Sequence, residues 1–123
     1  MHNIFKILAF LWTLLIFHFS LDESPSVPKI NIQYPDKVVH FIFYFVFVYF
    51  WSKSLKSKRL NYLLIVLFSA LTLGILIEFL QKNFTHNRSF DWYDILANSI
   101  GAIVSFIYVK KFCAIKNQIK ISH

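Results

Sequence analysis

Cysteine and charged residues are scarce in this chain, and both shortages limit the kinds of protein that it can be. The single cysteine among 123 residues, Cys113, excludes an intrachain disulfide and a cysteine-based metal site. Charged residues make up 15% of the chain, whereas about a quarter is usual for a soluble domain. Hydrophobic residues reach 57% and the mean hydropathy is +0.55, so the excess apolar surface has to face lipid. The length leaves room for one membrane domain, residues 1–123.

Four apolar segments stand apart, and each has about the 20 residues that a helix needs to cross a bilayer. They cover residues 4–21, 36–52, 60–82 and 91–109. A lone strand in lipid would leave its backbone groups unpaired, and four segments are too few for a barrel. Within the first segment, Lys6 resembles the positive start of a signal peptide and the run after it resembles the apolar region, but no small-x-small cleavage site follows. The sequence therefore predicts an all-α bundle of four transmembrane helices.

The three prolines all lie between the first two segments, which predicts an extended connector there. Pro35 stands directly before the second segment, where it is able to end the connector. Asp36 then falls at the position of a helix N-cap, which favours a short polar acceptor. We therefore expect the second helix to begin at Asp36.

The net charge of +7 has a topological explanation. The basic residues sit beside apolar runs and do not alternate with base-reading elements, so no nucleic-acid partner is expected. Nine of them fall on one side of the predicted helices: Lys6, Lys53, Lys56, Lys58, Arg59, Lys110, Lys111, Lys116 and Lys120. Four fall on the other side: Lys29, Lys37, Lys82 and Arg88. The positive-inside rule therefore predicts a multi-pass protein of the cytoplasmic membrane with both termini in the cytoplasm.

Polar side chains form stripes on the second, third and fourth segments, near their predicted outer ends. An ionisable side chain inside the bilayer costs about 2.5–3.5 kcal/mol, so such residues are retained for a reason. The stripes follow helical spacings of three and four residues. They consist of Asp36, His40 and Tyr44; of Gly74, Glu78 and Gln81; and of Asp91, Asp94, Asn98, Gly101 and Ser105. The two glycines, the only ones in the chain, permit close approach of helices.

The simplest packing turns the three stripes toward one another and forms a small hydrated cleft below the outer surface. Lys37 and Arg88 would neutralise some of its carboxylates, because buried charges persist mainly as pairs. The predicted binding residues are Asp36, Lys37, His40, Glu78, Gln81, Arg88, Asp91, Asp94 and Asn98.

These residues also carry a resemblance to a known family. The chain resembles the VanZ-like family of bacterial membrane proteins over residues 36 to about 106, in three motifs: Asp36-Lys37-x-x-His40-Phe41, Gly74-x-x-x-Glu78-x-x-Gln81 and Arg88-x-x-Asp91-x-x-Asp94-x-x-x-Asn98-x-x-Gly101. The resemblance implies a small four-helix protein of the cell envelope, in a family whose founding member is associated with resistance to the glycopeptide antibiotic teicoplanin. The resemblance assigns a catalytic role to none of these residues. Ser105 departs from the pattern, since such proteins often carry glycine there.

Each site residue has a structural interpretation beside the functional one. Asp36 serves equally as a helix cap, and Lys37 and Arg88 as interfacial cations whose side chains reach toward water. His40 is also explained by a hydrogen bond to a neighbouring helix. Glu78 is the hardest to explain by packing alone, because it places a carboxylate inside the third segment.

The predicted function is recognition of a polar or anionic group in the cleft, with membrane lipid, a lipid-linked cell-wall precursor or a glycopeptide as the ligand. The alternative is an enzyme acting on a lipid-linked substrate, because the His, Asp and Glu side chains are able to hold a metal or exchange protons. No Ser or Cys nucleophile has an evident base, and no His-x-x-x-His or Glu-x-x-His pair occurs. We therefore predict neither metal nor cofactor and favour a binding protein. An accessory subunit of a membrane complex also fits the small size.

The charge asymmetry makes a prediction about topology. Single cysteines introduced at Ser26 and Ser89 should react with a membrane-impermeant thiol reagent added outside, because both positions lie in predicted outer connectors. Cysteines at Ser57 and Ser122 should be protected, because both lie on the predicted cytoplasmic side. Labelling of Ser57→Cys from outside would reverse the orientation.

Overall fold

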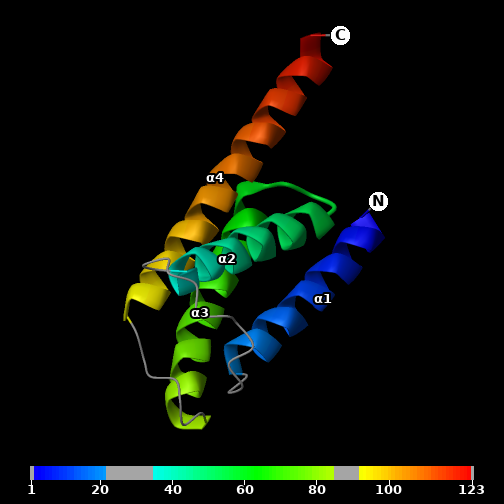
Figure 1. Cartoon of the computed structure of the whole chain (residues 1–123). Coiled ribbons are helices and arrows are strands. Elements are labelled where there is room, and N and C mark those ends of the chain that lie inside the picture. The colour runs from blue at the N-terminus through cyan, green and yellow to red at the C-terminus, as the bar shows by residue number, and fades with distance from the viewer. Residues whose placement is uncertain (1, 22–34, 85–91, 123) are drawn as a thin grey trace.

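The chain forms four α-helices, which a computed structural model describes over residues 2–21, 35–84 and 92–122. The helices are α1 (His2–Leu21), α2 (Pro35–Ser54), α3 (Leu60–Phe84) and α4 (Trp92–Ser122). No strand occurs in these three ranges. The N-terminal end of α1, the connector of residues 55–59 and the C-terminal end of α4 point toward one end of the bundle, so successive helices alternate in direction (Figure 1). The predicted all-α bundle is confirmed.

Three of the helices are long and apolar enough to cross a membrane, which makes the chain a multi-pass membrane protein. The apolar stretches are Asn3–Leu21, Leu60–Asn83 and Trp92–Lys116. Helix α2 differs because its first two turns carry Asp36, Lys37 and His40. It packs against α1, α3 and α4, and its apolar part supplies core residues. Helix α2 therefore lies at the centre of the helix contacts and carries charged residues at its start.

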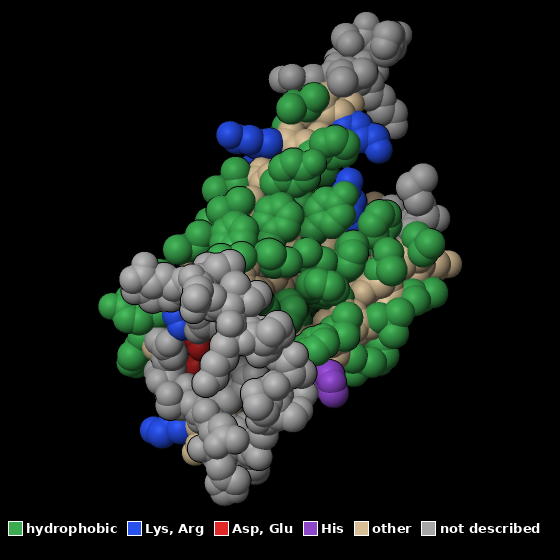
Figure 2. All heavy atoms as spheres, in the orientation of Figure 1, with side chains coloured by type: hydrophobic (Ala, Val, Ile, Leu, Met, Phe, Trp, Pro, Cys, Tyr) green, Lys and Arg blue, Asp and Glu red, His purple; other side chains and the backbone are tan. Residues whose placement is uncertain are grey.

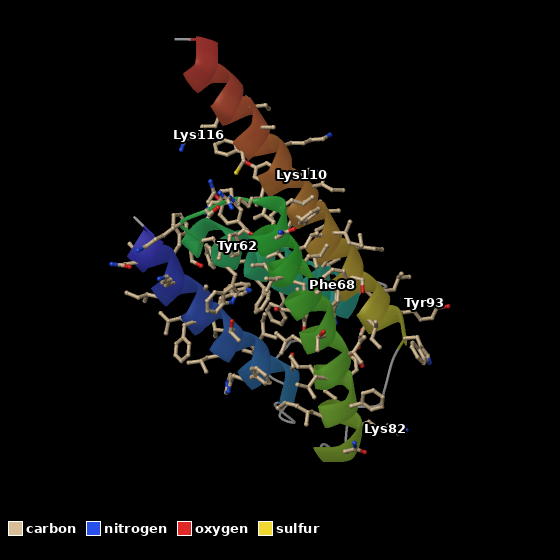
Figure 3. All side chains as sticks on the ribbon, turned by 180° about the vertical axis from the view of Figure 1, so that it is seen from behind. Tyr62, Phe68, Lys82, Tyr93, Lys110 and Lys116 are labelled. Carbon is tan, nitrogen blue, oxygen red and sulfur yellow. The ribbon has the colours of Figure 1, made fainter. Side chains whose placement is uncertain are left out.

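Apolar side chains fill the interior and also cover the outside of the bundle. The core contains Ile16, Tyr44, Phe47, Val48, Val66, Ala70, Ile77 and Ala102. Hydrophobic side chains also spread over the visible outer face, while Lys and Arg side chains lie toward the two ends (Figure 2). Lys110 and Lys116 lie at the end opposite Lys82 (Figure 3). This distribution suits helices surrounded by lipid.

Helix α4 is longer than the sequence predicts, and its predicted end at residue 109 is wrong. The helix continues to Ser122, through the basic residues that follow the apolar segment. No Gly or Pro occurs in this stretch, and Lys, Ala, Ile and Gln all tolerate helix, so nothing local ends it. Lys53 of α2 also lies over the Phe112 ring, 4.5 Å from its centroid. The loss of hydropathy marks the edge of the apolar segment rather than the end of the helix.

Helix α2 begins one residue earlier than predicted, at Pro35. Proline suits the first helical position because the N–H that it lacks has no intrahelical acceptor there. Asp36 therefore lies in the first turn, and its predicted place as the N-cap is wrong. An acidic residue in the first turn still complements the positive end of the helix dipole.

Two glycines set the distances between helices, as the sequence predicts. At Gly101 of α4, a Cβ would lie 2.3 Å from the backbone oxygen of Phe41 in α2. At Gly74 of α3, a Cβ would lie 3.1 Å from Nδ2 of Asn98 in α4. The backbones of α2 and α4 therefore meet at Gly101, whereas Gly74 makes room for a side chain.

Hydrogen bonds from two tryptophan side chains link helices α1 and α2. Trp12 Nε1 donates a hydrogen bond to the backbone oxygen of Phe43 at 2.8 Å. Trp51 Nε1 donates to Thr13 Oγ1 at 3.1 Å. Both bonds cross from one helix to the other inside an apolar environment, where an unpaired indole N–H would be costly. They hold α1 against the side of α2.

Substitution of the two glycines should have unequal effects. We expect Gly101→Ala to destabilise the bundle by about 1–3 kcal/mol, because the added methyl group meets a backbone oxygen that cannot turn away. Gly74→Ala should be nearly neutral, because the Asn98 amide can shift and alanine favours helix by about 1 kcal/mol. Thermal unfolding in detergent measures both. Equal effects would contradict the proposed α2–α4 contact.

Candidate functional site

An ion pair joins the first turn of α2 to the first turn of α4. Lys37 Nζ lies 2.6 Å from Asp94 Oδ1, and the two side chains are 20% and 11% exposed. Asp94 is also well placed for the dipole of its own helix, since it lies in the first turn of α4. The distance is that of a charge-assisted hydrogen bond. The pair therefore neutralises two charges at the edge of the apolar interior.

His40 lies one turn below Lys37 on α2 and faces two residues of α4. Its Nδ1 atom lies 2.9 Å from Asn98 Oδ1, and its Nε2 atom lies 3.6 Å from Asp94 Oδ2. Because the Asn98 oxygen is an acceptor, the imidazole donates from Nδ1. Lys37 and His40 lie three residues apart on α2, and their partners Asp94 and Asn98 lie four residues apart on α4. Each pair of residues therefore lies on one face of its helix, so that both contacts form between the same two faces.

Glu78 brings a third helix to the same place. It lies on α3 and is completely buried. One ligand-type atom from each of His40, Glu78 and Asp94 lies within 4.8 Å of the others. The sequence predicts that His40, Glu78, Arg88 and Asp94 converge on one cleft. The structure brings His40, Glu78 and Asp94 together, while Arg88 lies outside the described residues. Their use in binding stays a prediction. We call these three residues with Lys37 and Asn98 the polar cluster.

The other predicted site residues lie elsewhere or outside the described part. Gln81 Nε2 donates a hydrogen bond to the backbone oxygen of Ser20 at 2.6 Å, so this residue ties α3 to α1. Arg88 and Asp91 lie outside the described residues, as does the side chain of Asp36. The partner of Gln81 has no signal in the sequence, because any residue type supplies a backbone oxygen.

Further buried polar groups lie beside or below the polar cluster on α2 and α4. Tyr44 lies one turn below His40 on α2, and Ser105 lies about two turns beyond Asn98 on α4. Its hydroxyl, Asn98 Nδ2 and Ser105 Oγ are buried without a hydrogen-bond partner in the described residues. A buried polar group left this way costs about 1–3 kcal/mol. These groups are available to a polar species that enters the bundle.

Comparison with known proteins gives one family and one relative. The model of the VanZ/LLP1 family matches residues 2–114. The match includes α1, which the predicted region of residues 36–106 leaves out. An uncharacterised protein of the fission yeast Schizosaccharomyces pombe is 33% identical over 104 residues. That match covers 83% of this chain and 61% of the yeast protein. No solved structure matches the chain.

The relative bears on the predicted source of the chain. It comes from a fungus, so similarity to this chain is not confined to bacteria, and the bacterial origin stays a prediction. The family match, by contrast, includes all the residues of the polar cluster. From this match, the chain belongs to the VanZ/LLP1 family.

Proposed function

We propose that the chain is a membrane-embedded binding protein whose polar cluster recognises the anionic head group of a lipid or of a lipid-linked cell-envelope molecule. The observation that carries the proposal is the gradient of burial at the cluster. Lys37 is the most exposed member, whereas His40, Asp94, Asn98 and Glu78 are buried. A positive charge therefore lies at the most exposed part of the cluster, and hydrogen-bonding groups lie buried below it. An anionic oxygen would meet this charge first.

A neighbouring cavity supports a ligand with an apolar chain. The cavity has a volume of about 450 Å³ and lies between α1, α2 and α3, with Thr13, Phe47, Trp51 and Leu73 in its lining. Leu73 precedes Glu78 by little more than one helical turn, so cavity and cluster follow each other along α3. A lipid would place its head group at the cluster and an acyl chain in the cavity.

The cavity continues onto the outer face of α3. A second hollow shares Ile65, Ser69 and Leu73 with it and also includes Phe68. Ile65 and Phe68 are more than half exposed, and Figure 3 labels Phe68 on this face. In a bilayer this face meets lipid tails. The continuity supports entry of an acyl chain sideways from the membrane.

The proposed ligand gives a physical route to glycopeptide resistance. Teicoplanin acts on the cell envelope, and resemblance to the VanZ-like family motivates a role for this chain in susceptibility to it. In this proposal, the outer ends of the helices face the extracytoplasmic side and both termini lie in the cytoplasm. Binding of a lipid-linked wall precursor at the polar cluster would then occur on the side that the antibiotic reaches.

Catalysis on a lipid-linked substrate is the second candidate, and one observation favours it. The His40 imidazole is oriented by Asn98 and faces a carboxylate of Asp94, with Glu78 close by. Such a group is suited to move a proton to or from a substrate. Release of a water-soluble head group from a lipid by the purified protein would support an enzyme over a binding protein.

Lipid binding tests the proposal through Lys37. We expect wild-type protein in detergent to bind phosphatidylglycerol, and Lys37→Gln to bind it at least about tenfold more weakly, because a hydrogen bond between charged groups contributes about 1.5–3 kcal/mol. Native mass spectrometry with added lipid measures the bound fraction. The control is Lys56→Gln, which removes an equal charge from an exposed side chain in the connector of residues 55–59. Equal losses in the two variants would contradict a specific site.

A further inference from the structure

We propose that His40, Glu78 and Asp94 bind one divalent transition-metal ion of the Zn²⁺ or Mn²⁺ class. Each residue comes from a different helix, and all three side chains are buried. Their ligand-type atoms lie within 4.8 Å of one another. The inference goes beyond head-group recognition, because the three side chains hold the ion whether or not a lipid is bound.

The donor set selects the class of metal. One imidazole nitrogen and two carboxylate oxygens form a mixed set, since imidazole suits Zn²⁺ and its neighbours while carboxylates also suit Mn²⁺. Zn²⁺ holds nitrogen and oxygen ligands at about 2.0–2.2 Å, so two ligand atoms on one ion lie about 3.3–3.6 Å apart. His40 Nε2 and Asp94 Oδ2 are already 3.6 Å apart. The ligand atom of Glu78 lies within 4.8 Å of those of His40 and Asp94, so rotation of the Glu78 side chain would complete the site.

The same distance argues against a simple hydrogen bond. A hydrogen bond between nitrogen and oxygen spans about 2.7–3.2 Å, and a charge-assisted one is shorter still. The 3.6 Å between His40 Nε2 and Asp94 Oδ2 is longer than that. Yet both residues make close contacts through their other polar atoms, at 2.9 and 2.6 Å. The facing pair of atoms is therefore spaced for a shared ion.

Asn98 and Lys37 orient the two ligands in the manner of an outer coordination shell. Asn98 Oδ1 accepts a hydrogen bond from the N–H at His40 Nδ1, which leaves the lone pair of Nε2 facing inward. Lys37 holds Asp94 Oδ1, which leaves Oδ2 facing His40. Metal-binding histidines and carboxylates usually have such partners, because the partners fix the tautomer and the direction of the ligand. The two contacts are independent of Glu78.

Buried donors beside the cluster give a second observation that points to a ligand. Tyr44 lies one turn from His40 on α2 and is 1% exposed, and its hydroxyl has no hydrogen-bond partner in the described residues. Asn98 Nδ2 is also buried without a hydrogen-bond partner in the described residues. Three protein ligands leave a coordination position for a water or for an anionic oxygen. These donors are placed to meet such an oxygen.

Metal titration of the full-length protein tests the site without any lipid. Protein in detergent is stripped with a chelator, dialysed and titrated with Zn²⁺, and with Co²⁺ as an absorbing probe. We expect about one equivalent of tightly bound ion, with Co²⁺ bands typical of mixed nitrogen and oxygen ligands. His40→Gln and Asp94→Asn should each weaken binding by at least about 100-fold, and Asn98→Ala by about 10–100-fold.

The matched control is His18→Gln, because His18 is exposed on α1 and lies outside the polar cluster. It should bind the ion as the wild type does. Wild-type protein that binds no ion overturns the proposal even if the variants fail to fold, and so does a control that loses as much affinity as His40→Gln. Since the titration contains no added lipid, loss of phosphatidylglycerol binding alone would leave the metal result unchanged.

Discussion

The ion pair between Lys37 and Asp94 holds the charged start of α2 against α4, and the polar cluster depends on that placement. Its 2.6 Å contact fixes the register of the two helices, so His40 meets Asn98 one turn further in. Gly101 makes the same register possible by letting the α2 backbone approach α4 closely. Losing Lys37 would remove this counter-charge from the buried Asp94 carboxylate in a medium of low dielectric constant, at a cost of about 3–5 kcal/mol. Helix α3 then adds Glu78 to a site that the contacts between α2 and α4 have already positioned.

The lipid environment explains why the polar residues gather in one place. Around the helices, apolar side chains face outward, and a charge among them has no solvent to stabilise it. Turning three polar stripes inward satisfies that constraint and concentrates carboxylates, an ammonium group and an imidazole in one small volume. The arrangement that makes these groups tolerable in a membrane also makes them suited to a cation, an anionic head group or both. The apolar cavity along α3 extends the site toward a ligand with an acyl chain.

Helical spacing in the sequence predicted the convergence of His40, Glu78 and Asp94, because polar residues three and four apart on an apolar helix face inward. Two features were missed for physical reasons. The spacing grouped Gln81 with these residues, but its amide donates to a backbone oxygen of α1, which leaves no mark on the pattern of side chains. Helix α4 continues past its apolar segment because no residue there breaks it. The ion proposed above was not predicted either, because spacing motifs detect ligands on one helix, whereas the three proposed ligands come from three helices.

A double-mutant cycle on Lys37 and Asp94 tests the central claim most directly, since the polar cluster requires these two residues to interact across helices. The free energy of unfolding in detergent would be measured for wild type, Lys37→Gln, Asp94→Asn and the double variant. If the contact is as described, each single variant lowers the free energy of unfolding. The double variant then loses less stability than the two single variants lose together. The expected coupling energy is about 1–3 kcal/mol, as for contacting residues in one network. Strictly additive effects would mean that α2 and α4 do not meet through this pair, and would contradict the account.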